Sequence, residues 1–306
     1  MTSADYLRTV RLLLAVAPAI FRHGPLALKG GTALNLFLRD MPRLSVDLDV
    51  VLTDHRLTRD EAFAVIAASL DAAKPELAAL GCTAEGGTTP QRDEVKLYIQ
   101  RDRTRLKVEV NHVFRGTVLP VRRRALVAKA QAMFQTGVTL PLLHPDELYG
   151  SKLVAALDRQ HPRDLFDVRG LYASSSLTPG IVECFVCYLA GHNRPVHEVL
   201  SGRTLNMAAA FTNEFTGMAN EPVSLDELHA VRQRLFTELP ARLTGNHRAF
   251  LLRLVRGEPD WPLMTCPHLA ALPALRWKLE NLHKLRKTNA AKFLAQVDAL
   301  AALFEQ

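Results

Sequence analysis

Two acidic side chains on one predicted strand are the clearest chemical feature of this sequence. Asp47 and Asp49 alternate with apolar residues, and side chains two residues apart on a strand point to the same face. Two carboxylates held close together repel each other unless a cation lies between them. Mg²⁺ suits such a pair, because it binds a few carboxylates together with phosphate oxygens. The pair therefore predicts a magnesium site that handles a phosphate-containing substrate.

A turn of small residues precedes the acidic strand. Gly30 and Gly31 follow an apolar run, and Thr32 comes next. Glycine leaves backbone N–H groups accessible, and the helix predicted to begin here presents its positive end to phosphate. Ser45, just before the acidic pair, can add a hydroxyl. Each motif alone also occurs as an ordinary turn, helix cap or solvated strand end, so their order along the chain supports the interpretation.

A third acidic residue is predicted on a neighbouring strand. Residues 94–100 and 105–113 read as the two strands of a hairpin, in which Lys107, Glu109 and Asn111 share one face. This pattern is typical of a third carboxylate presented beside the acidic pair. The alternative is a half-exposed strand that carries a cross-strand ion pair.

The remaining patterns predict an α/β (α+β) fold whose first half contains a mixed sheet and whose second half is helical. We expect the domains at residues 1–140 and 141–306. The expected elements are helices over 3–22, 32–39, 57–80, 145–159 and 282–304, strands over 26–29 and 45–52, and a loop over 86–90.

Composition limits the class of protein. The 306 residues are 48% hydrophobic, enough to bury a core, and the net charge of +7 favours an acidic partner such as nucleic acid or nucleotide. The four cysteines form no disulfide framework, which fits a cytoplasmic location, and we expect Cys184 and Cys187 to be buried in a helix. We expect no signal peptide and no membrane span.

Four motifs in this order make the sequence similar to the AbiEii/MenT-type nucleotidyltransferase toxins of bacterial toxin–antitoxin (abortive infection) systems. The resemblance covers about residues 26–170, and Glu109 stands where the family often has aspartate. The motifs are Gly30, Gly31 and Thr32 with Arg43, Ser45, Asp47 and Asp49; Lys107 with Glu109; Glu147 with Lys152; and residues 163–167, which begin with Arg163 and Asp164.

The resemblance implies a polymerase-β-like fold in the first half and a Mg²⁺-dependent transfer of a nucleotide from an NTP to an RNA 3′ end. The implied acceptor is tRNA, the implied result is a block of translation, and an antitoxin protein is an implied partner. We expect two Mg²⁺ ions, with Mn²⁺ as an alternative metal. The expected roles are metal binding by Asp47, Asp49 and Glu109; catalysis by these three with Lys152 and Asp164; and phosphate binding by Gly30, Gly31, Thr32, Arg43, Ser45 and Lys152.

Other functions stay open at this point. The same enzyme could modify a hydroxyl of a protein or of a small molecule such as an antibiotic, or the chain could be a non-catalytic nucleotide-binding regulator. Two basic clusters are candidates for acceptor binding, although a charged run is more often a solvated face. They are Arg122, Arg123 and Arg124 with Lys129, and Lys278, Lys284, Arg286 and Lys287 around Trp277 and His283.

Overall fold

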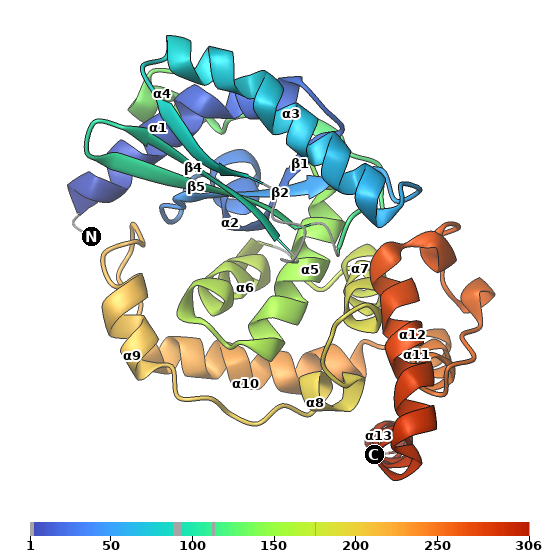
Figure 1. Ribbon diagram of the computed structural model, residues 1–306. Coiled ribbons are helices and arrows are strands. Elements are labelled where there is room, and N and C mark those ends of the chain that lie inside the picture. The colour runs from blue at the N-terminus through green and yellow to red at the C-terminus, as the bar shows by residue number, and fades with distance from the viewer. Residues whose placement is uncertain (1–2, 88–93, 112–113, 175, 306) are drawn as a thin grey trace. The chain divides into compact units, whose positions relative to one another are not determined.

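The chain folds into two compact units in a computed structural model that describes residues 3–87, 94–111, 114–174 and 176–305 (Figure 1). Unit 1 comprises Met1–Leu148 and Thr216–Pro222. Unit 2 comprises Tyr149–Phe215 and Val223–Gln306. The chain first passes from unit 1 to unit 2 inside one helix, somewhat later than the domain boundary expected at 140/141.

Unit 1 contains a mixed seven-stranded sheet in the order β3-β4-β5-β2-β1-β7-β6. The central strand β2 pairs with β1 in antiparallel and with β5 in parallel orientation, whereas β1 and β7 are parallel. The strands are β1 (Leu26–Lys29), β2 (Asp47–Leu52), β3 (Thr83–Gly87), β4 (Glu94–Arg101), β5 (Thr104–Asn111), β6 (Arg122–Ala125) and β7 (Thr139–Leu142).

Alternating burial along the sheet confirms the period-two pattern of the sequence. On β5, Leu106, Val108 and Val110 are fully buried, while Lys107 and Glu109 are half-buried on the other face. An alternating strand can bury one face in a core and keep its polar face available for chemistry. The same alternation holds for the first residues of β2.

Helices α1 and α3 pack against each other and against the sheet (Figure 1). A capping box begins α3: the Thr58 hydroxyl accepts a hydrogen bond from the Glu61 N–H, and the Glu61 carboxylate accepts one from the Thr58 N–H. The helices of this part are α1 (Ser3–Arg22), α2 (Gly30–Ala33) with the π-helical turn η1 (Leu34–Leu38), α3 (Arg59–Ala79) and α4 (Ala128–Phe134).

Unit 2 is helical, and helix α5 leads into it. Cys184 and Cys187 are buried on α7, as the sequence predicts. In the described part of the chain, no helix is both long and apolar enough to cross a membrane.

The helices from α5 onward are α5 (Pro145–Asp158), α6 (Pro162–Ser174), α7 (Pro179–Ala190), α8 (Val196–Leu200), α9 (Ala208–Ala210), α10 (Leu225–Ala241), α11 (Gly245–Val255), α12 (Pro273–Thr288) and α13 (Ala290–Glu305). The short π and 3-10 turns are η2 (Phe211–Phe215), η3 (Trp261–Leu263) and η4 (Leu269–Ala271).

Several sequence expectations about the elements are wrong. The long helix expected over 282–304 is two helices, because the Asn289 side chain accepts a hydrogen bond from the Lys292 N–H and starts α13 as a new helix. Strand β3 occupies the first residues of the expected loop over 86–90, of which 88–90 lie outside the described residues. The helix expected from Thr32 begins at Gly30.

Candidate active site

Strand register brings the predicted acidic residues together in unit 1. On the parallel pair β2 and β5, Asp47 lies opposite Lys107 and Asp49 lies opposite Glu109. Residues directly opposite each other in a sheet project to the same face. The expected placement of Glu109 beside the acidic pair is therefore confirmed, and Lys107 joins the cluster.

Lys107 is the cation of this cluster. Its Nζ lies 2.6 Å from Oε2 of Glu109. Partial burial lowers the pKa of Lys107, but the hydrogen bond with Glu109 and the charges of Asp47, Glu109 and Asp49 outweigh burial, so the pKa is raised overall. The three carboxylates thus create a negative potential at the Lys107 ammonium and favour its charged form.

The Gly30 turn lies against the Asp49 carboxylate. Gly30 has a φ of +73°, a conformation that residues with a Cβ rarely adopt, and a Cβ at this position would overlap the carboxylate. A Cβ at Gly31 would lie 2.7 Å from the Arg43 guanidinium and 3.1 Å from Oγ of Ser45. Gly30 therefore requires glycine, because its backbone has a positive φ and passes very close to Asp49 of β2.

Thr32, Arg43 and Ser45, which were expected to bind phosphate, form hydrogen bonds with other residues of unit 1. The Thr32 hydroxyl lies 2.6 Å from the Asp47 carbonyl oxygen and 3.0 Å from Oγ of Ser45. Arg43 is buried, and its Nη1 donates to the Leu44 carbonyl at 3.0 Å. These contacts brace the glycine turn against β2, and direct phosphate binding by these side chains stays a prediction.

Asp47 and Asp49 fit a Mg²⁺ ion that also binds substrate phosphates. Both are half-buried and project from the same face of β2, and Mg²⁺ in phosphate-transfer sites commonly uses one or two carboxylates. Among the described residues, no three His, Cys, Asp or Glu side chains are grouped to hold a metal ion. The fit is to a two-carboxylate site, with Glu109 held by Lys107.

Glu147 has a structural partner in unit 1. Its side chain is fully buried and accepts hydrogen bonds from the backbone N–H groups of Val118 and Leu119, at 2.8 and 3.0 Å. A buried carboxylate with two backbone donors fixes the segment before β6. The motif that pairs Glu147 with Lys152 in the sequence thus contains a glutamate with a folding role.

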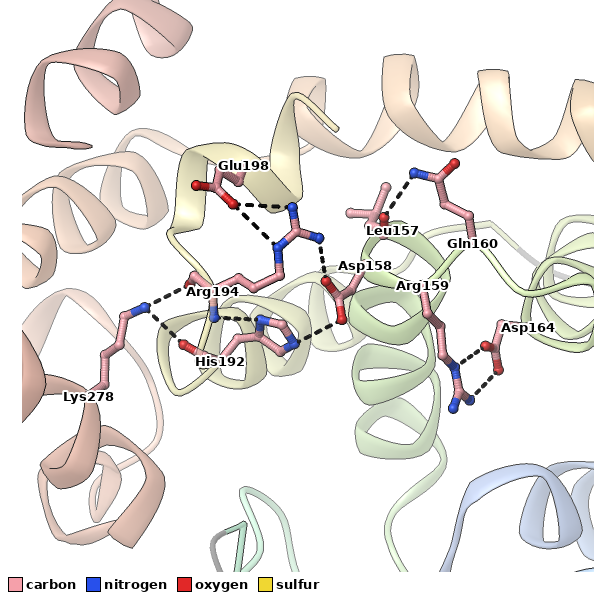
Figure 2. Close-up of polar contacts among 9 residues, drawn as sticks. All are labelled: Leu157, Asp158, Arg159, Gln160, Asp164, His192, Arg194, Glu198 and Lys278. Carbon is pink, nitrogen blue, oxygen red and sulfur yellow. Dashed lines mark hydrogen bonds and ion pairs between the residues drawn. The ribbon is translucent and has the colours of Figure 1, made fainter. Parts of the chain in front are cut away.

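Lys152 belongs to a buried ion cluster in unit 2. Its Nζ lies 2.8 Å from Oδ1 of Asp164 and 3.1 Å from Oδ2 of Asp167. Arg159 also binds Asp164, with its Nε 2.5 Å from Oδ2 (Figure 2). Burial raises the pKa of Asp164, but the charges of Lys152 and Arg159 outweigh it and hold that pKa well below its usual range.

The structure adds two residues that the sequence left without a role at this cluster. Asp164 and Asp167 are three residues apart on α6 and so share a helix face, and both contact Lys152. Arg159 had no comparable signal, since α5 ends at Asp158 and α6 begins at Pro162, so helical spacing does not connect Arg159 to Asp164.

One of the two basic clusters differs from expectation. Lys278 is buried rather than surface-exposed, and its Nζ donates to the carbonyls of His192 and Arg194 at 2.9 and 2.7 Å (Figure 2). Its neighbour Trp277 is 54% exposed. Lys278 therefore serves as an internal tie of unit 2 and is removed from the candidate acceptor surface.

Comparison with known proteins adds an independent line of evidence. The family model described as "Nucleotidyl transferase AbiEii toxin, Type IV TA system" matches residues 11–281. Among solved structures, the chain is similar to MenT4, a nucleotidyltransferase toxin of Mycobacterium tuberculosis, with a TM-score of 0.59 and 19% sequence identity over 93% of this chain and 99% of that chain. This likeness shows a shared fold. A search of curated proteins finds no match.

Proposed function

This chain belongs to the AbiEii family of nucleotidyltransferase toxins, and from that premise we propose that it transfers a nucleotide from an NTP to an RNA 3′ hydroxyl in a Mg²⁺-dependent reaction. The proposed acceptor is the 3′ end of tRNA, whose modification would block translation in the cytoplasm. The family belongs to toxin–antitoxin systems, which implies an antitoxin partner. The observation that supports the proposal is the register that sets Asp49 opposite Glu109 while Gly30 lies against Asp49.

The proposed reaction exchanges one phosphorus–oxygen bond for another. The RNA hydroxyl oxygen attacks the α-phosphorus, the bond to the β-phosphate oxygen breaks, pyrophosphate leaves, and the hydroxyl proton passes to the Glu109 carboxylate. The ion pair with Lys107 would position the Glu109 carboxylate for this proton transfer. Mg²⁺ held by Asp47 and Asp49 would neutralise phosphate charge.

Two further groups would bind the triphosphate. The backbone at Gly30 and Gly31 begins α2 and offers N–H groups with no side chain in the way. Lys152 would bind phosphate by exchanging one of its two aspartate partners for phosphate oxygens, since both contacts are ion pairs of an ammonium with anionic oxygens. Asp164 and Asp167 would then act as positioning residues for Lys152.

Incubation of the protein with Mg²⁺, total tRNA and each labelled NTP in turn tests the proposal directly. We expect label on tRNA with the wild-type chain and a loss of roughly 100-fold or more in Asp49→Asn, as for removal of a main electrostatic group. Asp102→Asn is the matched control, because Asp102 is exposed in the β4–β5 turn at a φ of +53° that asparagine also tolerates.

Label on a protein or small-molecule acceptor with tRNA untouched would contradict the RNA acceptor but retain the transfer chemistry. NTP binding without label on any acceptor would contradict the enzymatic proposal itself and favour a regulatory module. Equal labelling by Asp49→Asn and the wild type would contradict the assigned site.

A further inference from the structure

The edge strand β6 presents three consecutive arginines to solvent. It is the last strand in the order β3-β4-β5-β2-β1-β7-β6, and all four of its residues are exposed. Arg123 is anchored, because its Nη2 donates to the Thr139 carbonyl at 3.3 Å. Beyond the backbone pairing with β7, the side chains of Arg122 and Arg124 form no hydrogen bond or ion pair with any residue that the structure describes. Their charges are therefore free to bind a ligand.

A hollow of about 380 Å³ lies beside this strand. Its lining contains the three arginines, Ala125, Phe37 and His144, and none of these residues is acidic. Arg122 and Arg124 are two residues apart and so project to the same side, roughly 6.8 Å apart along the strand. Two guanidiniums at that spacing can reach two separate phosphate groups.

A charged edge can also serve folding alone, since such residues prevent strands of other molecules from extending the sheet. That purpose requires charge but no particular ligand geometry. Arginine adds a planar fork of donors that matches phosphate in a bidentate way. A cluster of arginines beside a hollow whose lining contains an aromatic ring and no acidic residue fits a phosphate-rich partner better.

Register relates β6 to the acidic strand within the same sheet. Arg122 lies opposite Leu142, Leu142 pairs with Leu28, and Leu28 pairs with Val50, the residue after Asp49. Three strand spacings separate β6 from β2, which amounts to about 14 Å. A polymer chain whose end lies at the acidic pair therefore needs only a short length to reach the arginines.

We propose that β6 and the hollow beside it bind the phosphate backbone of the acceptor RNA, with Arg122 and Arg124 each contacting one phosphate. This inference rests on the proposed function, because it assumes that the RNA 3′ end lies at Asp47 and Asp49. The contacts are independent of base sequence, as is usual for arginine bound to phosphate. They position the acceptor strand and take no part in bond formation.

Binding of labelled tRNA in EDTA, without NTP, tests the surface separately from catalysis. The variant Arg122→Ser with Arg124→Ser removes the two unpaired charges, and the control Arg101→Ser with Arg103→Ser removes two arginines from the β4–β5 hairpin on the other side of β2 in the strand order. Only the β6 variant should bind more weakly. The slope of log affinity against log salt should become less steep by about 1.4, or roughly 0.7 for each phosphate that the variant no longer neutralises.

Mg²⁺-dependent binding of free NTP should be the same in both variants and the wild type, and circular dichroism should confirm that both are folded. Equal RNA affinity and salt slope in the wild type and the β6 variant would overturn the inference. So would a loss of free NTP binding in the β6 variant, because the hollow would then bind the nucleotide. A weaker-binding β6 variant, combined with no nucleotide transfer by the wild type, would support the surface and contradict the proposed function.

Discussion

At the scale of single residues, the ion pairing of Lys152 that the structure shows must be separated from the role that we propose for it. Lys152 neutralises Asp164 and Asp167, which are each 1% exposed, and it is the proposed cation for the triphosphate. Loss of activity in a simple Lys152 variant would follow from either role. A decisive test therefore needs a double variant, in which Lys152 is replaced and one of the two buried carboxylates is neutralised to compensate for the lost positive charge.

We predict that Lys152→Met destabilises the protein by about 3–5 kcal/mol, because it leaves buried carboxylates without their cation. Adding Asp167→Asn removes one of those charges and should recover much of the stability in urea unfolding. If Lys152 binds the triphosphate, nucleotide transfer stays lost in this stable double variant. Recovered transfer would instead assign Lys152 a folding role only.

At the scale of elements, a buried lysine fixes α12 to the turn between α7 and α8. Lys278 donates to two backbone carbonyls of that turn, while Arg194 bonds to Asp158 of α5 and Glu198 of α8 (Figure 2). Burial lowers the pKa of Lys278 to about 8, against the opposing charge of Glu198. The charged form is thus less favourable in the folded state than in the unfolded chain.

This lowered pKa predicts the direction of a pH effect. Above about pH 8 the folded protein releases a proton that the unfolded chain still holds, up to its pKa of about 10.4, so stability rises with pH over that window. The wild type should gain up to about 2 kcal/mol relative to Lys278→Met between about pH 8 and pH 9.5. Urea unfolding at several pH values measures the difference. Lys284→Met, an exposed lysine of the same helix, should show none of it.

At the scale of the whole molecule, unit 1 is completed by a segment from much later in the chain. The Leu44 N–H donates to the Met218 carbonyl, and the Asn220 N–H donates to the Pro42 carbonyl, each at 2.9 Å. The Asn220 side chain also donates to the Met41 carbonyl. These bonds hold the stretch that leads into the acidic strand β2.

We predict that Asn220→Ala costs about 1 kcal/mol, the usual net contribution of one hydrogen bond, and speeds hydrogen exchange at the Leu44 amide. Nucleotide transfer should fall as well, because this stretch aligns Arg43 and Ser45 beside the glycine turn. Asn213→Ala, an exposed change in η2, is the control. Unchanged exchange at Leu44 would show that the segment does not stabilise the approach to β2.

The sequence by itself determined the features that depend on neighbours along the chain. Alternation predicted β2 and β5 and the shared faces of Asp47 with Asp49 and of Lys107 with Glu109. The order of the four motifs predicted the family that the comparison confirms. Such patterns are readable because helix and strand periods act over a few residues.

Only the tertiary structure decided which distant groups meet. Hydrogen bonding from a remote segment made Glu147 structural, and ion pairing between two helices enclosed Lys152. Strand order placed the arginines of β6 at a sheet edge, and packing buried Lys278 although its neighbour Trp277 is exposed. These outcomes depend on long-range pairing and on the cost of burying charge without a partner, neither of which leaves a periodic signal in the sequence.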